Sequence, residues 1–266
     1  MTIKTEYAPG EFCWVDLMAK EMDAAKAWYA DLFGWTYEEQ DTGGGPRYGQ
    51  FYKDGKVVAG LGQMGEEMKG AGMPSMWNSY VSVEDVGAVA TRAAELGGSV
   101  MMPAMDVMDV GKMAILQSPE GAALAVWQPG KHVGAELCNA DGAFCWNELS
   151  TRDLEGSASF FGKLFGWDVR DPEPEYADGP AKMKMIFNGE RENGHMLEMT
   201  EEWGDMPPSW AVYFAVADID ATVAKAKELG GTVPVPATPI PVGTFAVIAD
   251  PQGGHFYAIQ LNELPD

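Results

Sequence analysis

Two acidic residues, Asp16 and Glu148, occupy matching positions in two similar segments that both begin Phe-Cys-Trp. Each carboxylate follows a tryptophan by two places (Trp14, Trp146), so the alternation of a strand would put the two side chains next to each other on one face. A carboxylate walled by aromatic rings is poorly solvated, which raises its pKa toward the range useful for general acid or base catalysis. Alternatively, each carboxylate accepts hydrogen bonds from hydroxyl, indole or backbone groups and only stabilises the fold.

The same alternation predicts further aromatic and polar side chains on these faces. Tyr80 and Tyr213 occupy related positions in later strand-like segments, and Asn78 shares the face of Tyr80. Aromatic walls with a few polar groups are typical of small-molecule sites, so we expect clefts that bind a small hydrophobic or aromatic molecule. The expected catalytic residues are Asp16 and Glu148, and the expected ligand-binding residues are Phe12, Trp14, Asn78, Tyr80, Phe144, Trp146, Tyr213 and Tyr257.

These residues lie in strands of a pattern that occurs twice in each half of the chain. After the first strand, apolar residues recur at helical spacing from Met22 to Phe33, and Gly34 ends the helix. Three short strand-like runs follow, and the order strand, helix and strands restarts at residue 77. The second half repeats it, which predicts four β-α-β-β-β units.

An internal duplication accounts for this repetition. Residues 10–35 and 142–167 share nine identities in 26 positions, and residues 77–100 and 210–233 share eleven in 24, too many for chance. The segment between the halves is rich in glycine and polar residues, as linkers are. We therefore expect one domain over 1–130, a linker over 131–141 and a second domain over 142–266.

Several motifs occur in the same order in both halves. The first helix ends in WYADLFGW or SFFGKLFGW, the second helix is followed by Glu-Leu-Gly-Gly, and each half closes with SPEGAALAVWQP or DPQGGHFYAIQL. In these features the chain resembles the vicinal oxygen chelate superfamily, which includes glyoxalase I, bleomycin-resistance proteins and extradiol dioxygenases. The resemblance covers nearly the whole chain. It implies an α+β fold in which the four units form two tandem half-barrel domains, each with a concave face that binds a small molecule, usually around a divalent metal.

The positions that carry the metal in the family are mostly unsuitable here. A divalent ion needs three or four converging nitrogen or oxygen donors. The resemblance puts these positions on Trp14, Asn78, Ala125 and Met64 in the first half, and on Trp146, Ala211, Tyr257 and Glu198 in the second. We therefore expect no cofactor. The alternative is a relocated divalent-metal site near His195, Glu198 and His255, which would support a glyoxalase (lyase) or dioxygenase activity.

Composition excludes some classes of partner. The chain has 40 acidic and 18 basic residues and a net charge of -22, which disfavours binding to nucleic acid or an anionic membrane. It has no apolar run of membrane-spanning length or signal-peptide pattern, so we expect a cytoplasmic protein. Three cysteines without a Cys-x-x-Cys motif argue against a disulfide framework or a thiolate zinc site.

Two β-α-β-β-β units already close a cleft, so both a monomer and a homodimer are compatible with the repeated units.

Overall fold

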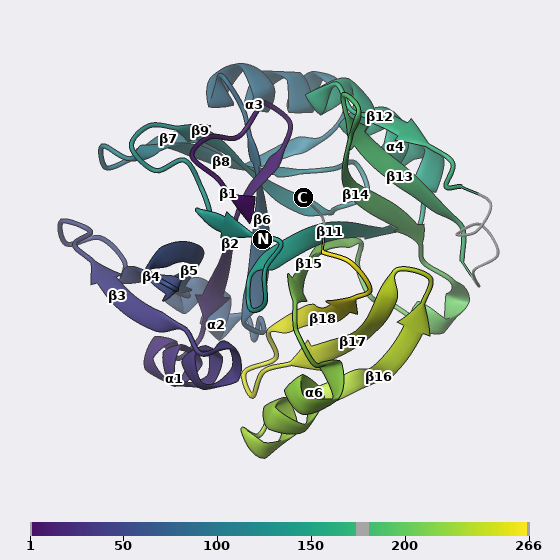
Figure 1. Ribbon diagram of the computed structural model, residues 1–266. Helices are drawn as coiled ribbons and strands as arrows, with labels where there is room; N and C mark the ends of the chain where they lie inside the picture. The colour runs from purple at the N-terminus through teal and green to yellow at the C-terminus, as the bar shows by residue number, and fades with distance from the viewer. Residues whose placement is uncertain (1, 174–180, 265–266) are drawn as a thin grey trace.

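The computed structural model describes residues 2–173 and 181–264, which contain two large sheets with helices around them (Figure 1). The strands of the first half are β2 (Phe12–Ala19), β3 (Thr36–Gln40), β4 (Tyr48–Lys53), β5 (Lys56–Gln63), β6 (Met76–Ser82), β7 (Ser99–Val107), β8 (Gly111–Gln117) and β9 (Ala123–Pro129). Those of the second half are β11 (Phe144–Thr151), β12 (Asp168–Arg170), β13 (Met183–Asn188), β14 (Arg191–Glu198), β15 (Ser209–Ala215), β16 (Thr232–Ile240), β17 (Gly243–Ala249) and β18 (His255–Leu261). Two short strands, β1 (Thr2–Ile3) and β10 (Leu137–Cys138), pair with each other.

Each half forms one eight-stranded sheet. The strand orders are β3-β4-β5-β2-β6-β9-β8-β7 and β12-β13-β14-β11-β15-β18-β17-β16. The first strands of the two units in a half are antiparallel neighbours at the centre, namely β2 with β6 and β11 with β15. The predicted α+β fold of four β-α-β-β-β units in two tandem domains is therefore confirmed.

The helices are α1 (Met22–Phe33), α2 (Glu66–Gly70), α3 (Val86–Glu95), α4 (Leu154–Phe165), the 3-10 helix η1 (Glu201–Trp203) and α6 (Ile219–Glu228). The related helices α3 and α6 begin in the same way, because the carboxylates of Asp85 and Asp218 accept the backbone N–H three residues on, at 3.0 and 2.9 Å. Gly34, at φ 70°, ends α1 in the left-handed region that glycine tolerates. The helix end at Gly34 is the one that the sequence pattern indicates.

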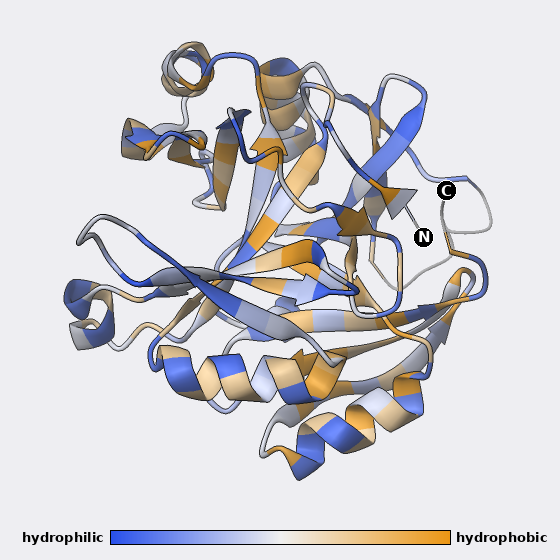
Figure 2. Ribbon diagram, turned by 60° about the vertical axis from the view of Figure 1, so that its left-hand side comes forward, coloured by the Kyte–Doolittle hydropathy of each residue, from blue (hydrophilic) through white to orange (hydrophobic). Residues whose placement is uncertain are grey.

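The two domains share one hydrophobic core. Tyr29 of α1 is fully buried; its hydroxyl donates to Asp250 in the second domain at 2.9 Å and accepts the indole N–H of Trp77 at 3.0 Å. Trp28 donates to the carbonyl of Leu229, next to α6, at 3.2 Å. Figure 2 shows the strands carrying many of the hydrophobic residues, whereas the helices alternate hydrophobic and hydrophilic residues. Helices of one half thus pack against the other half.

A polar pair lies within this shared core. Asn147 projects from the face of β11 opposite to that of Trp146 and Glu148, and it is 1% exposed. Its Oδ1 accepts a hydrogen bond from the Ser79 hydroxyl of the other domain at 2.6 Å. Burial of the asparagine is therefore compensated, because a hydrogen bond satisfies the polar atom.

The predicted alternation is wrong at the start of the first strands. Trp14 pairs with Tyr80, but Phe12 pairs with Val81, so a β-bulge at Cys13 interrupts the register. Tyr80 and Val81 point to opposite faces, and their partners therefore do too. Phe12 does not share the face of Trp14, because the bulge adds one residue and shifts the alternation.

The corrected orientation puts these phenylalanines in the shared core. The ring of Phe12 lies 5.5 Å from that of Trp167 and 5.2 Å from that of Trp210, centroid to centroid. The second copy has the same bulge, and Phe144 pairs with the fully buried Phe214. The expectation that Phe12 and Phe144 lie on the concave faces is therefore wrong.

The expected linker, residues 131–141, packs closely on the first domain. Ala135 donates its backbone N–H to the carbonyl of Cys13 at 2.8 Å, and Glu136 donates to that of Val57 at 2.8 Å. Leu137 is 2% exposed.

Within the described residues, no helix is both long and apolar enough to cross a membrane.

Candidate functional site

The concave face of the first domain holds a buried carboxylate in a ring of donors, which we call the Asp16 centre. Asp16 is 4% exposed. Its oxygens accept Asn78 Nδ2–H at 2.9 Å, Tyr80 Oη–H at 2.8 Å and Tyr48 Oη–H at 3.4 Å. Trp14 Nε1–H in turn donates to Tyr48 Oη at 3.1 Å. Burial raises the pKa of Asp16, and the hydrogen bonds oppose this only in part.

Tyr48 belongs to this centre although the sequence analysis did not identify it. Gly60 of β5 lies directly opposite Asp16. A Cβ atom on Gly60 would lie 2.1 Å from Tyr48 Oη and 2.8 Å from Asp16 Cβ, so only glycine leaves room for the tyrosine. Gly60 and Gly62 together leave one face of β5 bare, which is the sequence signal for a large side chain arriving from a neighbouring strand.

The second domain has a related centre around Glu148, which we call the Glu148 centre. Glu148 is 2% exposed. Its Oε2 lies 2.9 Å from His195 Nε2 and accepts the hydroxyl of Tyr213. Its Oε1 accepts hydrogen bonds from Ser150 at 3.1 Å and Tyr257 at 3.4 Å. The carboxylate therefore has four donors around it, contributed by strands β11, β14, β15 and β18.

The two carboxylates differ in acidity. Burial alone would raise the pKa of Glu148, but the adjacent His195 and the hydrogen bonds from Tyr213 and Ser150 outweigh burial and lower it. Glu148 is therefore a carboxylate at neutral pH. The expectation of a raised pKa holds for Asp16 and is wrong for Glu148. The reason is that the parallel pairing of β11 with β14 puts His195 directly beside Glu148.

A hydrogen bond from Trp146 determines the tautomer of His195. The indole Nε1–H donates to His195 Nδ1 at 2.7 Å. Since an indole nitrogen can only donate, Nδ1 must be the unprotonated nitrogen, and the proton resides on Nε2. Nε2–H then donates to Glu148. The chain Trp146–His195–Glu148 is thus a directed set of hydrogen bonds that ends on an anionic carboxylate.

Aromatic rings form a wall beside the Glu148 centre. Tyr213 and Tyr257 are stacked with their ring centroids 4.3 Å apart, and Phe245 stacks on the other side of Tyr257 at 5.9 Å. Tyr257 and Trp146 are both partly exposed. A flat molecule could contact these rings and the polar groups between them.

The first domain is more closed at the corresponding place. Trp14 is 3% exposed, and the imidazole of His132 from the expected linker meets it edge-on with ring centroids 4.6 Å apart. The partner of Tyr80 on β9 is Ala125, whereas Tyr213 has Tyr257. The structure thus brings together Trp14, Asp16, Asn78 and Tyr80 in one centre, and Trp146, Glu148, Tyr213 and Tyr257 in the other.

The three candidate ligands for a relocated metal do not converge. His195 is engaged in the Glu148 centre, Glu198 pairs with Lys182 at 3.4 Å, and the exposed His255 has its Nδ1 2.8 Å from the carbonyl of Gly253. Across residues 2–173 and 181–264, no group of three or more His, Cys, Asp or Glu side chains is placed to hold a metal ion.

The donor set of the Glu148 centre does not fit a metal ion either. A metal at His195 Nε2 would displace the proton from Nε2 to Nδ1, where it would face the N–H of Trp146. The lone pairs of Glu148 already accept hydrogen bonds. In the first domain, Asp16 is likewise surrounded by hydrogen-bond donors. Neither carboxylate is accompanied by the two or three further ligands that a divalent ion needs.

Comparisons with known proteins agree with this architecture. Residues 12–126 and 144–256 each match the family described as Glyoxalase/Bleomycin resistance protein/Dioxygenase superfamily. A Mycobacterium tuberculosis protein named "Putative glyoxylase CFP32" is 39% identical over 264 residues, which cover 98% of each chain. The "Anthracycline biosynthesis protein DauV" of a Streptomyces species is 35% identical over 277 residues, covering 97% of this chain and 96% of that protein.

A solved structure shows the same fold. The Mn(II)-bound glyoxalase from Novosphingobium aromaticivorans superimposes with a TM-score of 0.65 at 18% sequence identity, covering 97% of this chain and 84% of that one. The predicted resemblance is therefore confirmed. With both halves matched and relatives aligned over nearly their full length, the chain belongs to the glyoxalase/bleomycin resistance protein/dioxygenase superfamily.

Proposed function

We propose that this protein binds a small hydroxylated aromatic molecule on the concave face of its second domain, and that it does so without a divalent metal. The observation that carries the proposal is the Glu148 centre. Its carboxylate accepts the hydroxyl protons of Tyr213 and Tyr257, which leaves the hydroxyl oxygens to accept hydrogen bonds from a ligand. A ligand that donates hydroxyl or amine protons matches this arrangement.

The surrounding surface supports the aromatic part of the proposal. Trp146, Tyr257 and Phe245 are partly exposed and provide ring faces and edges against which a flat molecule would pack. The name of the Streptomyces relative refers to anthracycline biosynthesis, which is consistent with a fused aromatic ligand. The first domain, with Trp14 covered by His132, serves mainly to support the second.

Glu148 contributes to binding through Tyr257. A ligand hydroxyl that donates to Tyr257 Oη would extend the hydrogen bond that Tyr257 makes to Glu148 Oε1, 3.4 Å away. Because the pKa of Glu148 is lowered, the carboxylate stays ionised and the ligand keeps its hydroxyl proton. Asp16 keeps a structural role, because Oη of its partly exposed partner Tyr48 already accepts the indole N–H of Trp14, and its other tyrosine, Tyr80, is buried.

Titration calorimetry with 1,4-dihydroxyanthraquinone and unsubstituted anthraquinone, on chelator-treated protein, tests the proposal. The dihydroxy compound should bind more tightly, and Tyr257→Phe should weaken it about three- to tenfold, the value of one hydrogen bond of ~0.5–1.5 kcal/mol. Anthraquinone binding should change little. Tyr80→Phe in the first domain is the matched control and should leave both affinities unchanged. Binding that appears only after Mn²⁺ or Fe²⁺ is added would refute metal independence, and equal losses in the two variants would refute the location.

A further inference from the structure

A second pocket, of about 260 Å³, lies at the beginning of β11, between the N-terminal segment and the second domain. Its walls include Phe144, Cys145 and Trp146 on one side and Lys4 and Arg191 on the other. Glu148, Tyr213 and Tyr257 do not line it, so it is separate from the Glu148 centre, although Trp146 lines the pocket and also donates to His195 of that centre.

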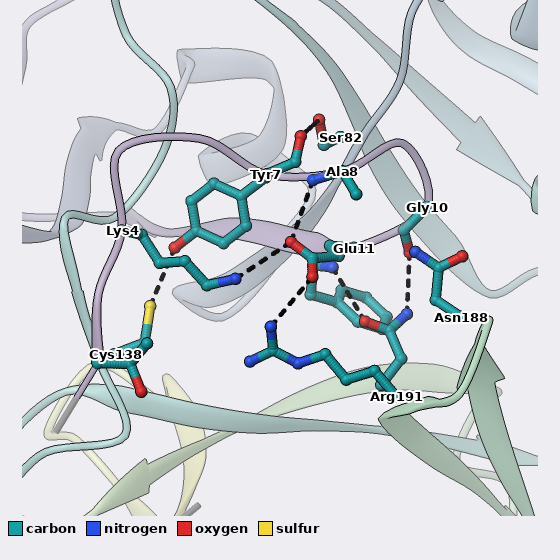
Figure 3. Close-up of polar contacts among 12 residues, drawn as sticks. Lys4, Tyr7, Ala8, Gly10, Glu11, Ser82, Cys138, Asn188 and Arg191 are labelled. Atoms are coloured by element: carbon teal, nitrogen blue, oxygen red, sulfur yellow. Dashed lines mark hydrogen bonds and ion pairs between the residues drawn. The ribbon is translucent and has the colours of Figure 1, made fainter. Parts of the chain in front are cut away.

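Two cations share one carboxylate at the polar end of this pocket (Figure 3). Glu11 accepts Lys4 Nζ–H at 3.2 Å through one oxygen and Arg191 Nη1–H at 3.1 Å through the other. The group of three carries one net positive charge in a chain whose overall charge is -22. Glu192 also borders the pocket, but it is exposed at the rim.

Arg191 retains capacity to bind an anion. Its guanidinium has five N–H donors in a planar fork, and among the described residues Glu11 takes one of them. Arg191 is 47% exposed, whereas Lys4 and Glu11 are 15% and 13% exposed. The largely buried Lys4–Glu11 ion pair thus positions Arg191. The remaining N–H donors of Arg191 suit a carboxylate.

In the first domain, residues that follow β9 cover the strand that corresponds to β11. There, the chain itself occupies the corresponding place: the His132 ring meets Trp14, and the N–H of Ala135 donates to the Cys13 carbonyl. The described residues after β18 do not take this place in the second domain, since Asn262 donates to Val242 and Leu264 is 47% exposed. The pocket beside Cys145 therefore corresponds to a place that the chain itself covers in the first domain, at Ala135.

We infer that this pocket is a second binding site, for a small aromatic carboxylate. In this inference the ring of the ligand lies among Phe144, Trp146 and Tyr7, and its carboxylate meets Arg191 beside Lys4. The inference concerns a separate surface and does not depend on the proposed function of the concave cleft.

Calorimetry with 1-naphthoate and the uncharged 1-naphthalenemethanol tests the site. The wild-type protein should bind naphthoate saturably and more tightly than the alcohol. Arg191→Gln should weaken naphthoate roughly tenfold or more and leave the alcohol unchanged, because only the carboxylate uses the guanidinium. Arg170→Gln removes the same charge from an exposed arginine of the same domain, paired with Asp168, and should have no effect. Absence of saturable naphthoate binding, or equal affinity in the Arg191 variant, would overturn the inference.

A second comparison separates the pocket from the concave cleft. Tyr257→Phe should leave naphthoate affinity unchanged, and Arg191→Gln should leave the affinity for 1,4-dihydroxyanthraquinone within about twofold of wild type. Loss of naphthoate binding in the tyrosine variant with retention in the arginine variant would place the ligand in the concave cleft and refute the second site. Thermal melts of both variants confirm that they are folded.

Discussion

Neutralising each buried carboxylate, by Asp16→Asn and Glu148→Gln, should distinguish the two centres. Glutamine at 148 presents an amide N–H₂ group to donors that now bind a carboxylate, so it loses charge-assisted hydrogen bonds and creates a donor–donor contact. Hydrogen bonds to charged groups contribute ~1.5–3 kcal/mol each, so we expect the free energy of unfolding at neutral pH to fall by about 3 kcal/mol. Asp16 has no basic partner, and its variant also removes a buried charge, so we expect a loss of about 1 kcal/mol or less.

The pH dependence of the two effects should have opposite signs. Glu148 has a folded pKa below its ordinary value of 4.5, so its contribution to stability is present above that value and is lost as the pH falls through the folded pKa. Glu148→Gln should therefore cost more near neutral pH than at about pH 4. Asp16 has a folded pKa above 3.8, so its ionisation destabilises the fold as the pH rises through that raised pKa. Asp16→Asn should therefore cost less near neutral pH than at about pH 4.

Urea unfolding followed by circular dichroism at the two pH values measures both effects. Thermal melts provide a second readout, since a loss of ~3 kcal/mol corresponds to roughly 6–12 °C in a protein of this size class. Wild-type protein at each pH is the reference, which removes the pH dependence of the groups that the substituted side chains do not contact. Equal losses in the two variants, or a pH dependence of the same sign, would refute the assigned electrostatics of the two centres.

Three further predictions concern packing and metal binding. Gly60→Ala should destabilise the fold by about 1–3 kcal/mol in urea unfolding, because the new Cβ would lie 2.1 Å from Tyr48 Oη. Gly62→Ala is the control, since its nearest contact is 3.1 Å away; equal stability of the two variants would contradict the packing. Asn147→Ala should cost about 1–2 kcal/mol by leaving the Ser79 hydroxyl unpaired, and adding Ser79→Ala should cost less than the sum of the single changes; strict additivity would argue against the hydrogen bond. Chelator-treated protein should show the same melting temperature with and without Zn²⁺, Ni²⁺, Mn²⁺ or Fe²⁺, whereas stoichiometric metal with a large stabilisation would refute the assignment.

The fold could be predicted from the sequence because its signals are repeated. The duplicated Phe-Cys-Trp segments, the helix-ending glycine at 34 and the paired glycines after the second helices each occur in related places, and they define the four units. The bulges at Cys13 and Cys145 could not be predicted. Strict alternation along a strand does not allow for an extra residue, so it predicts the wrong face for Phe12 and Phe144.

The candidate site could be predicted only in part. Alternation within single strands correctly grouped Trp14 with Asp16 and Trp146 with Glu148. The partners supplied by other strands depend on register between strands, which local patterns do not contain. Local patterns therefore do not place Tyr48 beside Asp16, although the glycines at 60 and 62 indicate room for a large side chain, and they suggest His195 as a metal ligand when its contact is Glu148.

The central claim is that the Glu148 centre is a complete hydrogen-bonded array with a defined histidine tautomer. Nitrogen-15 NMR of histidine-labelled protein, assigned with a His195→Gln variant, tests it most directly. Near neutral pH we predict an unprotonated, pyridine-type Nδ1 and a protonated Nε2 at His195, unchanged when Zn²⁺ is added. In Trp146→Phe the Nδ1 signal should shift because its donor is lost, whereas Nε2 should stay protonated because Glu148 still accepts from it. A protonated Nδ1 in the wild-type protein, or a metal-induced shift of Nε2, would contradict the account.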